Sequence, residues 1–372
     1  MTEGHAMLAR TNHDERAEQL FVRDLKTYIA GTLEPSIAKS AECLDPGEGH
    51  NSRAETTYRL LQESESFGGY LSLRRASQEL LWSLVGASVD RQRGDLDAAA
   101  RSAPVRGSLT LDPQTNQPEY LADRDVHLMP GGYGADIEGV AQGALMDRGG
   151  AVYMLGRNGG LLNDGRGWTL ASHLKTRWPG RAPKRILELG CGIGASAVPL
   201  AKAFPQAEVH ALDVGASMLR YAHARAAYLD VDIHFTQGNA ERAPYEDESF
   251  DCVFTCVVLH ETSPAGIEAI MAECARLLKP GGIVAHLEVP QRYDSVPLWT
   301  KVRGEIEHEY NNEPNWKVAI SADYAAQLTR AGFIDIETGF QDAVRDASPG
   351  SFDQVSKGVF RSWFLASGVK PQ

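Results

Sequence analysis

No run of lysine or arginine stands out in this chain, and its 49 acidic residues outnumber its 37 lysines and arginines, for a formal net charge of −12. The average field around such a protein repels polyanions, so nucleic acid is not expected as a partner. Long apolar runs are missing as well. The longest, such as residues 253–259, have the length of a strand and are too short to cross a bilayer, so no membrane association is expected.

Cysteine is scarce and odd in number, with five residues in 372. This count, with three cysteines in or beside expected core segments, fits a reducing compartment. Cys252 and Cys256 share one face of an expected strand. Because a metal site needs more ligands at closer, looped spacing, we expect packing there and no metal site. Residues 1–13 lack the apolar core of a signal peptide, so a cytoplasmic location is expected.

The remaining composition is that of an ordinary globular protein, and 372 residues are enough for two domains. Residues 1–150 are expected to form a mainly helical domain, with a short strand near 107–111, because apolar residues recur at near-helical spacing in 14–37 and 70–91. Residues 151–372 alternate short apolar strands with helices. Such alternation predicts an α/β domain with a parallel sheet covered by helices on both faces.

A glycine-rich turn is the most informative stretch of the sequence. Glu188-Leu-Gly190-Cys-Gly192-Ile-Gly194 follows the apolar run 185–187 and precedes a helical pattern. Alternating glycines let the backbone approach a ligand closely, with free N–H groups at the start of a helix. A carboxylate two residues before the first glycine can receive a cationic or hydroxyl group. The turn therefore predicts a small-molecule site.

The turn alone leaves two cofactors open. Gly190, Gly192 and Ala195 also satisfy the dinucleotide fingerprint, and Asp213 lies at a workable distance to bind a ribose. A nicotinamide-dependent oxidoreductase would explain these residues, but it would not explain three later motifs. These are Gly238-Asn239-Ala240 after one strand, Ser249-Phe250-Asp251 at the start of the next, and Leu277-Leu-Lys-Pro-Gly281-Gly282 at the end of a helix.

With these motifs in order, residues 184–289 resemble a class I S-adenosylmethionine-dependent methyltransferase of the ubiquinone-biosynthesis-like group. The resemblance implies a Rossmann-like, doubly wound, mostly parallel seven-stranded sheet with an antiparallel last strand, and S-adenosylmethionine as cosubstrate. It places the amino-acid end of the cosubstrate at Glu188, its ribose at Asp213 and its backbone contacts at Gly190, Gly192 and Gly194. The other expected cosubstrate contacts are Tyr153, Val214, Met218, Asn239 (where the family more often has aspartate) and Ala240.

His260 and Glu261 directly follow the fourth strand of the expected sheet. Chemistry in doubly wound sheets takes place at the carboxyl ends of strands. A histidine there can take a proton from an acceptor hydroxyl near neutral pH, or it only shapes the pocket. Glu261 is expected to orient His260 or to cap the next turn.

Residues 290–320 are an expected insertion that carries the acceptor pocket. Arg292 could hold a carboxylate of the acceptor, while Tyr293, Trp299 and Trp316 are pocket walls or lid packing. We expect O-methylation of a hydroxyl or carboxylate of a small molecule of secondary metabolism. Carbon or nitrogen methylation, or a non-catalytic protein that binds the cosubstrate, are the alternatives. The helical N-terminal domain is expected to form a homodimer and to close over the pocket, by analogy with related methyltransferases.

Overall fold

The computed structural model describes residues 4–45, 53–122, 124–135, 138–154, 156–289, 297–353, 355–358 and 360–372. Its described strands form one sheet of nine strands in the order β1-β4-β3-β2-β5-β6-β9-β7-β8. The strands are β1 (Ser108–Thr110), β2 (Arg185–Leu189), β3 (Glu208–Asp213), β4 (His234–Gln237), β5 (Phe250–Cys256), β6 (Leu278–Glu288), β7 (Ile334–Asp342), β8 (Phe352–Asp353) and β9 (Ser362–Val369).

Parallel pairing dominates the sheet. β2 pairs in parallel with β3 and β5, and β6 continues the parallel run beyond β5. The last strand, β9, runs antiparallel between β6 and β7. This arrangement confirms the predicted Rossmann-like fold with its antiparallel last strand. The predicted seven strands become nine because β1 and β8, of three and two residues, extend the two edges. The short strand predicted near 107–111 is β1, which joins the sheet through β4, whereas no prediction covered β8.

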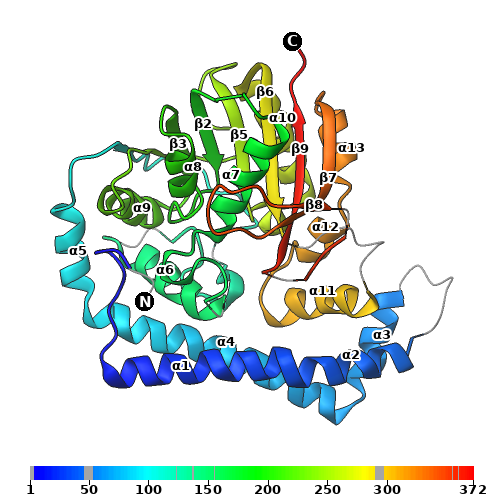
Figure 1. The fold of residues 1–372 in the computed structure, drawn as a ribbon. Helices are drawn as coiled ribbons and strands as arrows, with labels where there is room; N and C mark the ends of the chain where they lie inside the picture. Colours follow the sequence, from blue (N-terminus) through cyan, green and yellow to red (C-terminus); the bar gives the residue numbers. More distant parts are fainter. Residues whose placement is uncertain are drawn as a thin grey trace.

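Helices cover both faces of this sheet (Figure 1). Successive side chains of a strand point to opposite faces. In β2, Ile186 therefore packs in one core cluster with α7, α8 and α9, while Leu187 packs in another with α10 and α13. The helices of this half are α6 (Ala141–Tyr153), α7 (Gly165–Arg177), α8 (Ala197–Ala203), α9 (Ala216–Tyr228), α10 (Pro264–Leu277), α11 (Leu298–Tyr310), α12 (Trp316–Ser321) and α13 (Tyr324–Arg330).

The N-terminal third is mainly helical, as predicted. Its helices are α1 (His13–Tyr28), the π-helix η1 (Ile29–Leu33), α2 (Glu34–Cys43), α3 (Arg53–Gln62), α4 (Glu65–Arg91) and α5 (Arg93–Arg101). Asn12 and Glu15 begin α1 with a reciprocal capping box. The long helices α1 and α4 lie side by side across one end of the sheet (Figure 1). Among the described residues, no helix combines the length and apolar character needed to span a membrane.

The N-terminal helices share cores with the rest of the chain. Val302 and Ile306 of α11 pack in one cluster with residues of α2, α3 and α4. The predicted boundary at residue 150 falls inside α6, and β1 pairs with β4 of the main sheet. Short 3-10 helices complete the architecture: η2 (Val126–Leu128), η3 (Gly160–Leu162) and η4 (Leu259–Glu261). These contacts place the N-terminal third directly against the strand ends that carry the predicted site.

A buried ion-pair network ties the N-terminal segment to α6 and α9. Asp147 on α6 accepts hydrogen bonds from the Tyr221 hydroxyl at 2.8 Å and from Arg225 Nε at 3.2 Å. His5 Nε2 lies 2.8 Å from the same carboxylate, and Asn163 donates to it at 2.9 Å. Both Asp147 and Arg225 are fully buried. Removing one charge of such a pair leaves the other without compensation.

We expect Asp147→Asn to destabilise the protein by about 3 kcal/mol at neutral pH, because Arg225 then keeps a buried charge without a counter-ion. Burial by itself raises the pKa of Asp147, but Arg225 and His5 outweigh it and lower the pKa from 3.8 to about 2. A depressed carboxyl pKa contributes stability that is present above pH 4 and is lost as the pH falls towards 2. Urea unfolding of both proteins across this range tests the network. A stability difference that does not shrink in acid would contradict it.

Candidate active site

A cavity of about 780 Å³ lies at the carboxyl ends of the central strands. One wall consists of the glycine turn after β2, the end of β3, the turn after β4 and η4 after β5. The opposite wall comes from α1, α4, α6, α11 and the segment 118–133. The cavity therefore lies between the sheet and the N-terminal helices.

The glycine turn has the backbone that its sequence predicts. Gly190 and Gly192 have φ angles of +75° and +50°, a region that side chains rarely adopt, and both line the cavity. A Cβ added to Gly190 would lie 2.7 Å from a methyl group of Val258. Gly194 differs, because it does not line the cavity and a Cβ there would meet the Phe235 ring at 3.2 Å. Gly194 thus serves close packing of the turn on the sheet.

Glu188 is buried beside this turn with an unused acceptor. Only 1% of the residue is exposed, and its Oε2 has no hydrogen-bond partner among the described residues. Burial raises the pKa of Glu188 well above its usual value, although nearby Arg166 opposes the shift. Glu188 and Arg166 both line the cavity. A buried carboxylate with a free oxygen fits a cationic group of a ligand, as the amino-acid end of the predicted cosubstrate would supply.

Glu188→Gln separates a binding role from a structural one. The neutral amide keeps the shape of the side chain but loses the charge-assisted bond to a ligand ammonium group, which is worth about 1.5–3 kcal/mol. We expect affinity for S-adenosylmethionine to fall at least about tenfold. The unliganded protein should keep its melting temperature or gain a little, since a buried charge without a partner is removed. Calorimetry and thermal unfolding check both statements, and a large loss of stability with unchanged affinity would contradict them.

Asp213 ends β3 with its carboxylate held by the backbone. Oδ2 accepts the N–H of Gly192 at 2.7 Å, and Oδ1 accepts the N–H of Gly215 at 2.9 Å. Burial raises the pKa of Asp213, and these backbone donors oppose the rise. Each oxygen retains a further lone pair, and the residue lines the cavity. The carboxylate is therefore held in one orientation and keeps acceptor capacity, as the predicted ribose contact requires.

Of the other predicted cosubstrate contacts, four line the cavity and one does not. Tyr153, Val214, Asn239 and Ala240 line the cavity. The side-chain oxygen of Asn239 already accepts the N–H of Glu241 at 2.8 Å, so one of its two lone pairs is left for a ligand. Met218 is a correction: it is fully buried in the core between α6 and α9 and does not line the cavity. Its position on α9 turns its side chain towards the core and away from the cavity.

His260 and Glu261 lie in η4, directly after β5, and both line the cavity. The Nδ1 atom of His260 lies 2.8 Å from Oε2 of Glu288. The other oxygen of Glu288 accepts the backbone N–H groups of Val258 and Leu259 at 2.9 and 2.7 Å. Burial by itself lowers the pKa of His260, but Glu288 and Glu261 outweigh it and raise the pKa to about 10. An imidazole with that pKa is protonated at neutral pH, which does not favour its predicted role as a base.

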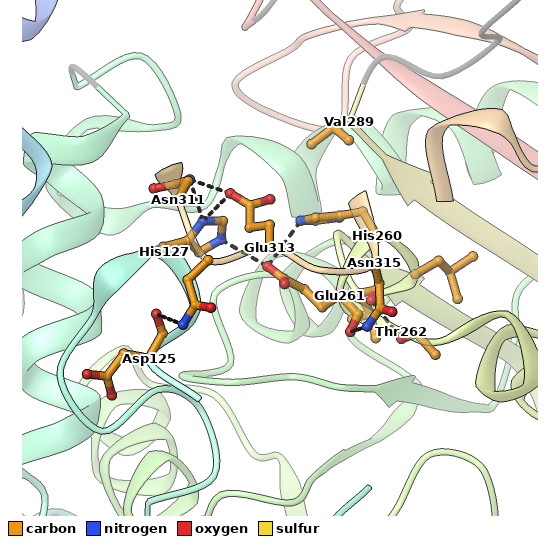
Figure 2. A network of polar contacts seen from close by, with 12 residues as sticks. Asp125, His127, His260, Glu261, Thr262, Val289, Asn311, Glu313 and Asn315 are labelled. Atoms are coloured by element: carbon orange, nitrogen blue, oxygen red, sulfur yellow. Dashed lines mark hydrogen bonds and ion pairs between the residues drawn. The ribbon is translucent and has the colours of Figure 1, made fainter. Parts of the chain in front are cut away.

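Two further residues join this pair from distant parts of the chain (Figure 2). His127 in η2 places Nε2 2.9 Å from Oε1 of Glu261 and Nδ1 2.8 Å from Oε1 of Glu313. Glu313 lies in the loop between α11 and α12 and is buried. Both line the cavity. No sequence motif marks either residue, because each comes from an irregular segment far from η4. Only the fold brings them to the histidine–glutamate pair.

The predicted acceptor residues have different positions. Trp316 lines the cavity, with its ring centroid 5.2 Å from that of His260 and nearly perpendicular to it. Trp299 is a correction: its indole N–H donates to Glu34 at 2.9 Å and its ring packs near Tyr70, away from the cavity lining. Arg292 and Tyr293 lie outside the described residues. The sequence did not separate pocket aromatics from those that pack α11 against the N-terminal helices.

The far end of the cavity is charged, a feature that no sequence motif predicts. Lys26 of α1 and Arg74 of α4 line it, together with Arg303 and Glu307 of α11. Lys26 donates to the Gln78 side chain at 2.6 Å, and Arg74 is paired with Glu307 at 2.5 Å. Burial lowers the pKa of Lys26 to about 7. Polar groups of an acceptor can thus be bound by the N-terminal helices.

Comparison with known proteins identifies the domain that carries these strand ends. Residues 186–282 match the methyltransferase domain family. The chain is 28% identical over 187 residues to a fatty-acid O-methyltransferase of Mycolicibacterium smegmatis, covering 50% of this chain and 60% of the relative. It is 35% identical over 125 residues to a demethylmenaquinone methyltransferase of Deinococcus radiodurans, covering 34% of this chain and 50% of that relative. The chain thus spans between half and two thirds of each of these relatives.

Solved structures resemble the chain more distantly. A phosphoethanolamine N-methyltransferase of Haemonchus contortus, bound to S-adenosylhomocysteine, is 20% identical with a TM-score of 0.40, over 55% of this chain and 52% of that one. The family match and the curated relatives bear out the resemblance that the glycine turn, the acid after β3 and the later motifs indicate. The cosubstrate of this fold is S-adenosylmethionine. Residues 186–282 thus form a methyltransferase domain of the class I S-adenosylmethionine-dependent kind.

Proposed function

We propose that the protein transfers the methyl group of S-adenosylmethionine to an oxygen atom of a small molecule bound in the cavity. One observation supports the proposal: Glu188 and Asp213, the proposed cosubstrate contacts, line the same cavity as the polar groups around His260. Relatives named fatty-acid O-methyltransferase and malonyl-[acyl-carrier protein] O-methyltransferase support oxygen as the acceptor atom. Their likeness covers half of this chain or less.

Different residues of the site are proposed to bind the cosubstrate and to align the acceptor. S-adenosylmethionine, when bound, supplies an electrophilic methyl group. Glu188 would hold the ammonium end and Asp213 the ribose, which leaves the reacting end to face η4. The N-terminal helices and Trp316 close the other side of the cavity. Alignment of an acceptor in a site without bulk water supplies much of the acceleration that such a transfer needs.

The acceptor is proposed to be a small molecule with a polar end. Lys26 and Arg74 line the part of the cavity contributed by the N-terminal helices, and His260 and Glu261 line the part nearest the turn. A hydroxyl or carboxylate fits the hydrogen-bonding groups at either end. The homodimer stays a prediction; Phe21 and Tyr28 on the outer side of α1 are exposed apolar residues that a second subunit could cover.

The proposal is tested with isotope-labelled S-adenosylmethionine and a small-molecule extract of the host. We expect one class of compound to gain the labelled methyl group, and fragmentation by mass spectrometry locates it on oxygen. A label on carbon or nitrogen would favour the alternative acceptor atoms. Tight cosubstrate binding without any methylated product would favour a non-catalytic binding protein, and binding of a nicotinamide dinucleotide instead would favour an oxidoreductase.

A further inference from the structure

Four side chains that meet at the centre of the cavity have the composition of a metal site. His127, His260, Glu261 and Glu313 each offer a ligand atom, and these atoms all lie within 4.8 Å of one another. Figure 2 shows them converging from η2, η4 and the loop after α11. We propose that this cluster binds one divalent transition-metal ion, which holds the acceptor. The second part of this inference rests on the proposed methyl transfer.

The spacing of the cluster fits one ion. The Nε2 atoms of His127 and His260 both approach Oε1 of Glu261, at 2.9 and 3.3 Å. Nitrogen and oxygen ligands bind such ions at about 2.0–2.2 Å, which places neighbouring ligands of one ion roughly 3.0–3.4 Å apart. Each histidine nitrogen thus lies at the separation from Glu261 Oε1 that is expected of two ligands of one ion, and all four ligand atoms lie within 4.8 Å of one another.

An unused acceptor atom in the cluster provides a second, independent indication. Glu313 Oε2 is buried and makes no hydrogen bond within the described part of the chain. Only 1% of Glu313 is exposed. Buried carboxylate oxygens nearly always have a donor or a cation beside them. An unpaired carboxylate oxygen in a cluster of two histidines and two glutamates therefore indicates a place for a cation.

The surroundings orient both histidines as metal ligands usually are. Glu288 accepts from Nδ1 of His260 at 2.8 Å and is itself fixed by two backbone N–H groups. A carboxylate on the far nitrogen fixes the orientation of the ring and turns Nε2 towards Glu261, and binding of an ion would displace the proton that Nε2 carries. His127 is held in a left-handed conformation, with φ at +56°. Its carbonyl accepts hydrogen bonds from Trp82 at 2.8 Å and Gln78 at 2.9 Å, which maintain a backbone that costs about 1 kcal/mol or more.

The ligand types favour Zn²⁺, Fe²⁺ or Mn²⁺ over Mg²⁺ and Ca²⁺, because imidazole suits transition metals and the latter two prefer oxygen ligands alone. All four side chains line the cavity, so an open coordination position would face the acceptor. A hydroxyl bound there would release its proton to solvent more readily. Its oxygen would then form the bond to the methyl carbon as the carbon–sulfur bond breaks, and the cosubstrate would leave as the thioether.

The test uses the full-length, tag-free protein, stripped with a chelator and titrated with Zn²⁺, Mn²⁺ and Co²⁺. We expect saturable binding of one ion per chain, and for Co²⁺ a visible absorption spectrum that reports nitrogen and oxygen ligands. Glu313→Gln and His127→Gln should each weaken binding at least about tenfold, as loss of a ligand or of the carboxylate that orients it does. Glu268→Gln, at an exposed position on α10, is the matched control and should bind as the wild type does.

Two results would overturn the metal site: no saturable binding of any of the three ions, or binding that is unchanged in Glu313→Gln and His127→Gln. In the second case the ion binds elsewhere, and the cluster is a polar contact between the N-terminal third and η4. The proposed methyl transfer is judged separately, by cosubstrate calorimetry and turnover of the stripped protein. Methyl transfer that proceeds fully without metal would sustain the proposed function and overturn the role of the ion.

Discussion

Replacing Asp213 by alanine should reduce the affinity for S-adenosylmethionine at least about 100-fold. The carboxylate is expected to accept two hydrogen bonds from the ribose, and each bond to a charged group is worth about 1.5–3 kcal/mol. Asp213 also accepts the N–H groups of Gly192 and Gly215, so its loss leaves two buried donors unpaired and loosens the turn that shapes the site. A loss of 2.8 kcal/mol or more corresponds to about two powers of ten in the dissociation constant.

Isothermal titration of S-adenosylmethionine and S-adenosylhomocysteine into both proteins measures this effect. Asp95→Ala on α5 is the matched control, because Asp95 is exposed and far from the cavity lining. It should bind both compounds as the wild type does. An Asp213→Ala protein that is folded and keeps wild-type affinity would remove the ribose contact from the proposal.

Replacing His260 by alanine should slow methyl transfer by about 100-fold while changing the cosubstrate affinity less than twofold. His260 lines the cavity beside Glu261 and Trp316 but is not among the expected cosubstrate contacts. Its removal therefore affects the acceptor and the reacting oxygen, where a positioned acid, base or ligand contributes about 10²–10⁴-fold. The expected separation is a low kcat with an unchanged cosubstrate dissociation constant.

The matched control for this variant is His308→Ala, since His308 is exposed on α11. Single-turnover measurements with labelled cosubstrate separate the chemical step from binding. Unchanged turnover in His260→Ala would show that the histidine only shapes the pocket, and it would also argue against its place in the metal cluster. Lost cosubstrate affinity would instead point to a structural role for η4.

The central sheet could be predicted from the sequence because its signals are local. Each strand from β2 to β6 combines a short apolar run with a turn motif, and Gly190 and Gly192 require the backbone that the structure has. Glu188 and Asp213 follow from their positions at the ends of two such strands. The short strand near 107–111 could be predicted, but its pairing with β4 could not, because the two segments are distant in the sequence. β8 was not predicted, since two residues do not establish an alternating pattern.

The acceptor side could be predicted only in part, since it depends on contacts between distant segments. His260 and Glu261 were found from their place after a strand, but His127 and Glu313 lie in irregular segments with no motif. Met218 and Trp299 were predicted to contact a ligand, but neither lines the cavity. Residue type and position suggested a ligand contact for both, whereas helix packing determines where each side chain lies.

The most direct test is a crystal structure of the protein with S-adenosylhomocysteine. The ribose hydroxyls should lie within hydrogen-bond distance of Asp213, the ammonium group should lie beside Glu188, and the sulfur should face His260 across the cavity. A product molecule found elsewhere on the protein, or a nicotinamide dinucleotide that binds the glycine turn in its place, would contradict the methyltransferase site described for this chain.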